Sequence, residues 1–130
     1  MRWGIIGSGT IVTQFVNDTR QLNDTELAAL YSRSAEKAAR FAAQHGIGKA
    51  YASLQEMLAD STIENIYIGV PNNLHLDYVL QCVAAGKNVL CEKPMGINQT
   101  QVQTMLQAAK QNHVLLMEGM WTRFFPVMRS

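Results

Sequence analysis

The feature that most constrains the fold is the stretch 2–12, where two glycines separate a short apolar run from the expected start of a helix. Ile5 and Ile6 are β-branched and apolar, as residues of a parallel strand buried on both faces are. Gly7 and Gly9 carry no Cβ atom, so the backbone can turn tightly there and come close to a ligand. The helix start that follows offers unpaired N–H groups and the positive end of a helix dipole, which favour a pyrophosphate.

This glycine pattern is a weak signal by itself. It has Val12 at the third position, where Gly or Ala usually lets the helix pack closely on the strand. An ordinary strand–turn–helix that binds no nucleotide, with glycines serving geometry alone, fits the stretch equally well. The remainder of the chain has to decide between these two interpretations.

Expected strands and helices alternate along the chain. Ser34, Ser53 and Asn98 are suited to cap helix N-termini, and Gly46 is suited to end a helix. The expected strands are 2–6, 26–31, 49–51, 65–70, 88–91 and 114–118, and the expected helices are 10–22, 35–45, 54–60, 74–85 and 99–112. This alternation predicts an α/β fold with a Rossmann-type, doubly wound parallel sheet of about six strands in the order 3-2-1-4-5-6.

Composition and charge exclude several classes of protein. The 130 residues suit one domain, and the net charge of +1 gives no electrostatic footprint for nucleic acid or an anionic membrane. No apolar run approaches the roughly 20 residues of a membrane span, and no signal peptide precedes the first strand, so we expect a cytoplasmic protein. Cys82 and Cys91 are the only cysteines and form no metal-ligand cluster, so we expect reduced thiols and no metal site.

The residues after the second expected strand indicate the kind of dinucleotide. Many dinucleotide folds bind the ribose 2′-hydroxyl with an acid about 20 residues past the glycines, whereas this chain has Ser32 there. Arg33 follows, Ser34 is placed to cap the next helix, and Lys37 lies one turn into it. Hydroxyls, cations and a helix N-terminus suit a 2′-phosphate, which favours NADP(H), with NAD(H) as the alternative. In a simpler interpretation, Arg33 and Lys37 are solvated cations at a helix start.

A second candidate region lies at the end of the fifth expected strand. That strand runs into Glu92, Lys93 and Pro94, and open α/β sheets bind ligands at the carboxyl ends of their strands. His75 lies near the start of the expected helix 74–85. A histidine in that position more often makes local hydrogen bonds than catalyses a reaction.

Three motifs together give a more specific indication than any one of them. They are Gly7-Ser8-Gly9-Thr10-Ile11, then Cys91-Glu92-Lys93-Pro94 preceded by Ala85-Gly86-Lys87, and Trp121-Thr122-Arg123-Phe124-Phe125-Pro126. With them, essentially the whole chain resembles the N-terminal domain of the glucose–fructose oxidoreductase/inositol dehydrogenase (Gfo/Idh/MocA) family. The closing stretch 117–126 is most similar to the dihydrodiol and sugar dehydrogenase branch.

The resemblance implies hydride transfer between a nicotinamide cofactor and a sugar, polyol or dihydrodiol-type alcohol or carbonyl. It places Lys93 beside the reacting carbon, where its cation would polarise a carbonyl or stabilise an alkoxide, so Lys93 is the candidate catalytic residue. The candidate cofactor-binding residues, from the motifs above and from this resemblance, are Gly7, Ser8, Gly9, Thr10, Ile11, Ser32, Arg33, Ser34, Lys37, Pro71, Asn72, His75, Glu92, Lys93, Trp121 and Arg123.

Members of this family carry a second domain, which supplies most of the substrate pocket and a general acid/base histidine. No histidine of this chain matches that residue, so we expect the second domain to be absent and the chain alone to turn over little or nothing. We expect residues 1–119 to form the NAD(P)-binding domain and 120–130 to begin the crossover, with apolar side chains that favour a homodimer. The alternative function is a nucleotide-binding module without catalysis, or a truncated remnant.

Overall fold

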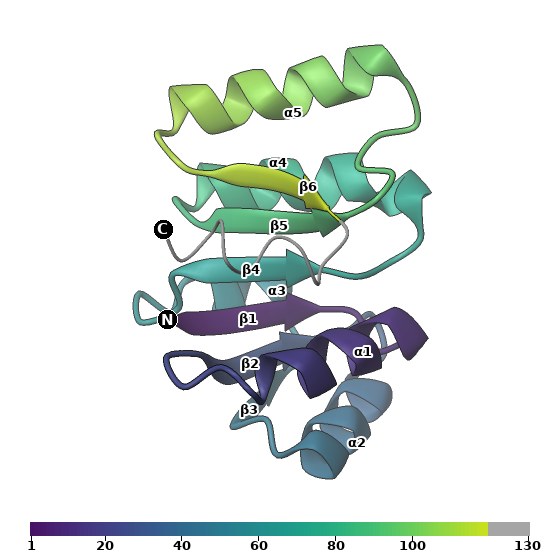
Figure 1. The fold of residues 1–130 in the computed structure, drawn as a ribbon, viewed down its shortest axis with the longest axis vertical. Helices are drawn as coiled ribbons and strands as arrows, with labels where there is room; N and C mark the ends of the chain where they lie inside the picture. The colour runs from purple at the N-terminus through teal and green to yellow at the C-terminus, as the bar shows by residue number, and fades with distance from the viewer. Residues whose placement is uncertain (120–130) are drawn as a thin grey trace.

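One sheet of six parallel strands forms the centre of the computed structural model, which describes residues 1–119 (Figure 1). The strands are β1 (Arg2–Ile6), β2 (Glu26–Tyr31), β3 (Lys49–Tyr51), β4 (Asn65–Ile68), β5 (Asn88–Glu92) and β6 (Leu116–Gly119). They run side by side in the order β3-β2-β1-β4-β5-β6, so the predicted fold class and strand order are confirmed. The predictions for Trp121, for Arg123 and for a homodimer through 120–130 fall outside the described residues.

Helices cover both faces of this sheet within residues 1–119. They are α1 (Thr10–Thr19), α2 (Ala35–His45), α3 (Leu54–Leu58), the 3-10 turn η1 (Asn72–Leu74), α4 (His75–Ala84) and α5 (Gln99–Gln111). The first two helices pack on one face of the sheet, and α3, α4 and α5 pack on the other (Figure 1). This is the two-layered covering that a doubly wound sheet requires.

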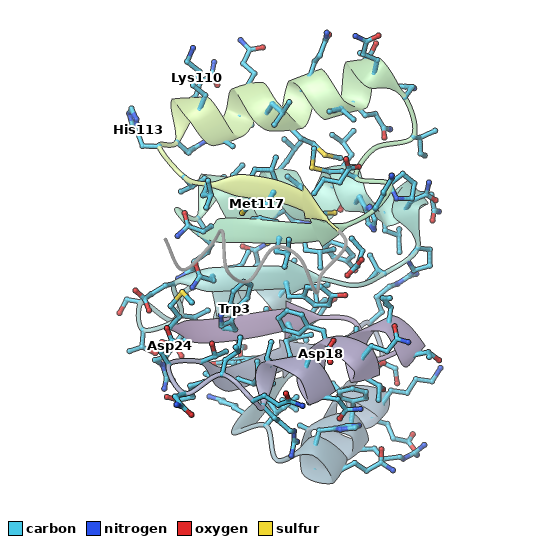
Figure 2. All side chains as sticks on the ribbon, in the orientation of Figure 1. Trp3, Asp18, Asp24, Lys110, His113 and Met117 are labelled. Atoms are coloured by element: carbon cyan, nitrogen blue, oxygen red, sulfur yellow. The ribbon has the colours of Figure 1, made fainter. Side chains whose placement is uncertain are left out.

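Alternation along β1 connects the central strand to both layers. Ile5 packs in the apolar cluster with α1 and α2, whereas Ile6 packs in the cluster with α3, α4 and α5. Trp3 shares the cluster of Ile5 and lies on the face of the sheet that is turned toward the viewer in Figure 2. Ile5 and Ile6 are at most 1% exposed, and burying each contributes roughly 1.5–3 kcal/mol.

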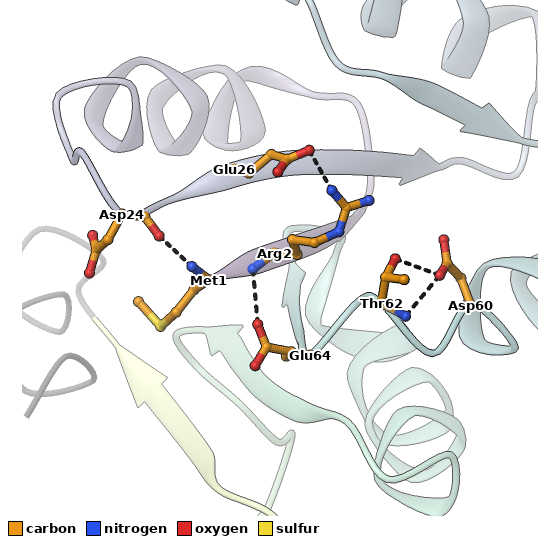
Figure 3. Close-up of polar contacts among 7 residues, drawn as sticks. All are labelled: Met1, Arg2, Asp24, Glu26, Asp60, Thr62 and Glu64. Carbon is orange, nitrogen blue, oxygen red and sulfur yellow. Dashed lines mark hydrogen bonds and ion pairs between the residues drawn. The ribbon is translucent and has the colours of Figure 1, made fainter.

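Polar contacts join the amino ends of the central strands, at the edge of the sheet away from the glycine turn (Figure 3). Arg2 Nη1 forms an ion pair with Glu26 Oε2 at 2.5 Å, and the Arg2 backbone N–H donates to Glu64 Oε1 at 3.3 Å. The N-terminal ammonium donates to the backbone oxygen of Asp24. These contacts tie β1 to β2 and to the turn before β4, so this edge of the sheet holds the strands together.

The predicted helix caps are confirmed. A backbone N–H group three residues further on donates to each of the side chains of Ser34, Ser53 and Asn98. Gly46 ends α2 in the left-handed region, with a φ of 66°. These local signals therefore set where α2, α3 and α5 begin and where α2 ends.

Some predicted boundaries differ from the structure. The first helix ends at Thr19 rather than at residue 22, and the Thr19 hydroxyl bonds back to the backbone oxygens of the preceding turn. The last strand begins at Leu116 rather than at residue 114. His113, with a φ of 57°, and the N–H of Val114 still belong to the turn that ends α5. Hydrogen bonds at the ends of α1 and α5 therefore set where α1 ends and where β6 can begin.

Among residues 1–119, no helix combines the length and the apolar character that crossing a bilayer requires. The same residues contain no group of three or more histidine, cysteine, aspartate or glutamate side chains that could hold a metal ion. Cys82 and Cys91 are free, buried thiols. Burial raises the pKa of Cys82 to about 12 and also raises the pKa of Cys91, so both thiols are protonated at neutral pH.

Candidate functional site

The candidate site lies where the chain changes direction across the sheet. β1 and β4 are neighbours at the centre, and the chain continues from them toward opposite edges (Figure 1). In open α/β sheets such a switch point leaves a crevice beyond the carboxyl ends of the strands, and ligands bind there. Gly7 directly follows β1, so the glycine turn lies at this crevice.

The turn after β1 packs directly against the loop after β4. The Gly69 N–H donates to the Ile6 oxygen at 3.0 Å. Gly7 has a φ of 121°, and a Cβ atom there would lie 2.4 Å from the Gly69 oxygen, so only glycine fits. A Cβ atom at Gly69 would lie 2.8 Å from Val12 Cγ2. The missing side chain of Gly69 therefore makes room for valine at the third position of the glycine pattern.

The start of α1 differs from the starts of α2, α3 and α5. Gly9 occupies the N-cap position, and no side chain caps this helix. A Cβ atom at Gly9 would meet no atom within 4 Å, so the backbone faces open space on that side. Thr10 is exposed and Ile11 is half-buried in the first turn. The first N–H groups of α1 and the positive end of its dipole are thereby available to an anionic group.

A cavity of about 220 Å³ opens beside the glycine turn. It is lined by the ends of β1 and β2 and by the chain from the end of β4 into α4, through Ile6, Gly7, Ser8, Ser32, Arg33, Val70, Pro71, Leu74 and Tyr78. The lining combines hydroxyls and a guanidinium with apolar and aromatic groups, which suits a flat ring joined to a polar group. Leu74 and Tyr78 were not predicted as site residues, although their spacing of four predicts neighbours on one helix face.

A second cavity, of about 350 Å³, lies between the glycine turn and α2. Its lining residues are Ser8, Gly9, Lys37, Arg40, Phe41 and Gln44. Ser8 lines both cavities, and its Oγ lies 3.5 Å from Ser32 Oγ. Among residues 1–119, no carboxylate lines either cavity, whereas three cations do: Arg33, Lys37 and Arg40, the last of which forms an ion pair with Glu36 at 2.7 Å. The electrostatics of this region therefore favour an anionic ligand.

The end of β5 carries the other group of predicted residues. Lys93 is exposed, and Glu92 before it is half-buried. The Tyr67 hydroxyl donates to Glu92 Oε2 at 2.7 Å. Burial raises the pKa of Glu92, against the opposing effects of that hydrogen bond, of the Lys93 backbone N–H and of the nearby His75 ring. A half-buried carboxyl and an exposed lysine therefore occupy consecutive positions at the carboxyl end of β5.

Side chains from two other elements hold the residues after Lys93. His75 is 1% exposed, and its Nδ1 lies 3.0 Å from the Pro94 oxygen and 3.1 Å from the Met95 oxygen. Its Nε2 lies 2.8 Å from the Val70 oxygen, in the loop after β4. The Met95 N–H donates to Glu118 Oε2, on β6. The buried His75 side chain therefore bridges the loops after β4 and β5, and it lines neither cavity.

The structure thus gathers the described candidate residues into two groups around one crevice. The glycine turn, the end of β2, the start of α2 and Pro71 surround the two cavities. Glu92 and Lys93 stand at the end of β5, and Asn72 is exposed in η1. Residues that the sequence did not single out complete the arrangement: Tyr67, Gly69, Leu74, Tyr78 and Glu118.

A parallel sheet of this strand order, an uncapped helix at a glycine turn and cationic cavities at the switch point define a dinucleotide-binding Rossmann domain. The family model described as an oxidoreductase family with an NAD-binding Rossmann fold, Gfo/Idh/MocA, matches residues 1–120. The chain belongs to this family.

Two curated relatives illustrate the branch of the family that the chain is similar to. It is 44% identical over 128 residues to the trans-1,2-dihydrobenzene-1,2-diol dehydrogenase of Xenopus tropicalis, covering 97% of this chain and 39% of that enzyme. It is 43% identical over 126 residues to a scyllo-inositol 2-dehydrogenase (NADP(+)) of Bacillus subtilis (strain 168), covering 97% of this chain and 38% of that enzyme. The chain therefore spans about two fifths of the length of these relatives.

A solved structure agrees with this assignment. A 3-ketoreductase from Actinomadura kijaniata, in complex with NADP and TDP-benzene, superimposes with a TM-score of 0.88 at 28% sequence identity. The match covers 99% of this chain and 40% of the ketoreductase. The fold of this chain is thus the fold of nicotinamide-dinucleotide-binding domains in oxidoreductases.

Proposed function

We propose that this chain binds NADP(H) in preference to NAD(H), as the cofactor domain of a dehydrogenase. The observation that carries the proposal is the end of β2, where Ser32 and Arg33 stand in place of an acid and line the first cavity. Lys37, in the first turn of α2, lines the neighbouring cavity. A carboxylate at this point would accept from a ribose 2′-hydroxyl and repel a 2′-phosphate, whereas hydroxyls and cations stabilise the phosphate.

The two cavities and the glycine turn together suit the rest of the adenosine half. Leu74 and Tyr78 offer an apolar surface for the adenine ring, and the Arg33 guanidinium can stack on an aromatic face. The open backbone at Gly9 and the uncapped start of α1 suit the pyrophosphate. The named relative from Bacillus subtilis uses NADP(+), and the named ketoreductase structure holds NADP, which supports the same preference.

The nicotinamide half belongs at the end of β5 in this proposal. The bound cofactor accepts or supplies a hydride. The Lys93 ammonium is exposed there and would stabilise negative charge on an alcohol or carbonyl oxygen of the substrate. We propose a sugar, polyol or dihydrodiol-type alcohol or carbonyl as that substrate, in agreement with the names of the relatives. Substrate selection and general acid/base catalysis would belong to a second domain.

The experiment is a calorimetric titration of the Arg33→Ala variant with NADPH and with NADH. Losing a charge-assisted contact to a phosphate weakens NADPH binding by about tenfold to a hundredfold, because such a contact contributes roughly 1.5–3 kcal/mol. NADH, which lacks the 2′-phosphate, should lose much less affinity. Lys110→Ala is the matched control, since Lys110 lies in the last turn of α5, away from both cavities (Figure 2). Equal losses for both cofactors would contradict the assignment of Arg33 to the phosphate.

A further inference from the structure

Tyr67 is a tyrosine in the middle of the apolar layer beneath α1. Its side chain is fully buried on β4, and its ring stacks on the ring of Phe15 with centroids 3.8 Å apart and planes 7° apart. Phe15 also contacts Trp3, whose ring meets it edge-on with the centroids 5.5 Å apart. Phenylalanine would fill this layer as well, so packing explains the ring but not the hydroxyl.

The hydroxyl of Tyr67 points out of this layer toward the end of β5. It donates to Glu92 Oε2 at 2.7 Å. Burial and the neighbouring carboxylate raise the pKa of Tyr67, so the hydroxyl keeps its proton and remains a donor. A Cβ atom at Gly69 would lie 2.8 Å from Tyr67 Cε2 and 3.2 Å from its oxygen. The glycine after β4 therefore leaves the space that the phenol ring occupies.

Glu92 connects this hydroxyl to Lys93. Lys93 directly follows Glu92 in the chain, and its backbone N–H is close enough to lower the pKa of the Glu92 carboxyl. One carboxylate thus joins a rigid group of the core to the backbone of the candidate catalytic residue. A buried hydroxyl is stabilising only when it is bonded, so the Tyr67 hydroxyl and the Glu92 carboxylate hold each other in one orientation.

We propose that Tyr67 is a positioning residue that fixes Lys93 through Glu92, and so orders the nicotinamide half of the cofactor site. This role rests on the proposed function, because it assigns the end of β5 to that half of the cofactor. The segment after Lys93 is already held by His75 and Glu118. The Tyr67 hydroxyl holds the residue before Lys93, because it donates to Glu92 at the end of β5.

The test removes one oxygen atom and compares two ligands. Tyr67→Phe keeps the stacked ring and loses the donor to Glu92. We expect it to weaken NADPH binding by about fivefold to tenfold, less than the loss of a direct hydrogen bond to a charged group, because the Tyr67 hydroxyl acts on the cofactor only through Glu92. Adenosine 2′,5′-bisphosphate contains only the adenosine half, so its affinity should change by less than about twofold. Tyr51→Phe is the matched control, because it loses the same oxygen on β3, the outermost strand on the side of the sheet away from β5.

Two further measurements separate positioning from a general loss of stability. In the Glu92→Ala background, Tyr67→Phe should change NADPH affinity by less than about twofold, because the acceptor is gone. Carboxyl NMR of the protein without cofactor should show a higher Glu92 pKa in Tyr67→Phe, with a displaced Lys93 amide signal.

Each outcome decides a different statement. Unchanged NADPH affinity in Tyr67→Phe, or equal losses for both ligands, would overturn the positioning role. An unchanged Glu92 titration together with an unchanged Lys93 amide signal would overturn it as well. A wild-type chain that binds no NADPH would contradict the proposed function instead, and the Glu92 titration would still decide whether Tyr67 holds the carboxylate.

Discussion

Gly7 and Gly9 are two residues apart and have different roles. Gly7 is a requirement of the fold, because its backbone has a φ of 121° and a Cβ atom would collide with the Gly69 oxygen. Gly9 has an extended backbone that other residues adopt, and open space lies beside it. A substitution at Gly7 should therefore affect stability first, and a substitution at Gly9 should affect ligand binding first.

Substituting each glycine by alanine separates these roles. Gly7→Ala should lower the free energy of unfolding by about 3 kcal/mol or more, from backbone strain and from the collision with backbone at Gly69. Gly9→Ala should cost less than about 1 kcal/mol of stability and still weaken NADPH binding, because the methyl group enters the space left for the ligand. Urea unfolding and calorimetric titration measure the two quantities. Similar unfolding midpoints for the two variants would contradict this division.

Glu92 predicts a pH dependence of stability. Its folded pKa is raised by burial, so the folded chain holds this proton more tightly than the unfolded chain does. Stability from Glu92 is therefore present below its ordinary pKa of 4.5 and is lost as the pH rises through the raised value. Relative to Glu92→Gln, the wild-type protein should become less stable between about pH 4 and pH 7. Urea midpoints at both pH values measure the difference. Glu56→Gln, at an exposed position, is the control. A constant or opposite difference would rule out this account.

At the scale of elements, the starts of the helices divide by function. Ser34, Ser53 and Asn98 cap α2, α3 and α5 with their own side chains, while α1 begins at Gly9 without a cap. In each capped helix, the cap side chain accepts from one of the first backbone N–H groups. Two of the described α-helices lack a side-chain cap: α4 continues directly from the 3-10 turn η1, whereas α1 begins at Gly9 beside a cavity, so α1 lacks a stabilising contact where a ligand can replace it.

Alanine at two of these caps should have different effects on binding. Asn98→Ala and Ser34→Ala should each lower the free energy of unfolding by about 1 kcal/mol. Only Ser34→Ala should also weaken NADPH binding, because α2 begins beside the cavities that hold the cations. Thermal unfolding with and without NADPH measures both effects. A smaller NADPH-induced rise in Tm for Asn98→Ala than for Ser34→Ala would be the opposite of this expectation.

At the scale of the whole molecule, the two edges of the sheet serve different purposes. Ion pairs and hydrogen bonds join the amino ends of the strands, and the cavities and Lys93 lie at the carboxyl ends. The core between them contains Cys82 and Cys91, both buried among residues of the layer beneath α3, α4 and α5. Access to these thiols requires the core to open.

The thiols therefore report on unfolding of the whole domain. Burial raises the pKa of both, so native protein should not react with a disulfide reagent at pH 8 over minutes, and urea-unfolded protein should react at once. Absorbance of the released thiolate measures the reaction. Rapid modification of either cysteine in the native protein would show that the layer opens without global unfolding.

Local patterns in the sequence predict much of this fold and less of its site. Strand order follows from alternation and handedness, and the caps follow from single residues such as Ser53. The contacts between Tyr67 and Glu92, and between Met95 and Glu118, join residues more than twenty positions apart. No periodicity or short motif encodes such pairs. The space that Gly69 leaves for Val12 was missed for the same physical reason.

The measurement that tests the central claim most directly is an amide NMR titration of the chain with NADPH, and with NADH at equal concentrations. NADPH should displace signals of the glycine turn, the end of β2, the start of α2 and Lys93 at lower concentrations than NADH does. Signals at the opposite edge of the sheet, such as Arg2 and Glu64, should stay in place. Displacements centred on that edge, or equal responses to the two cofactors, would contradict an NADP(H) site at the junction of β1 and β4.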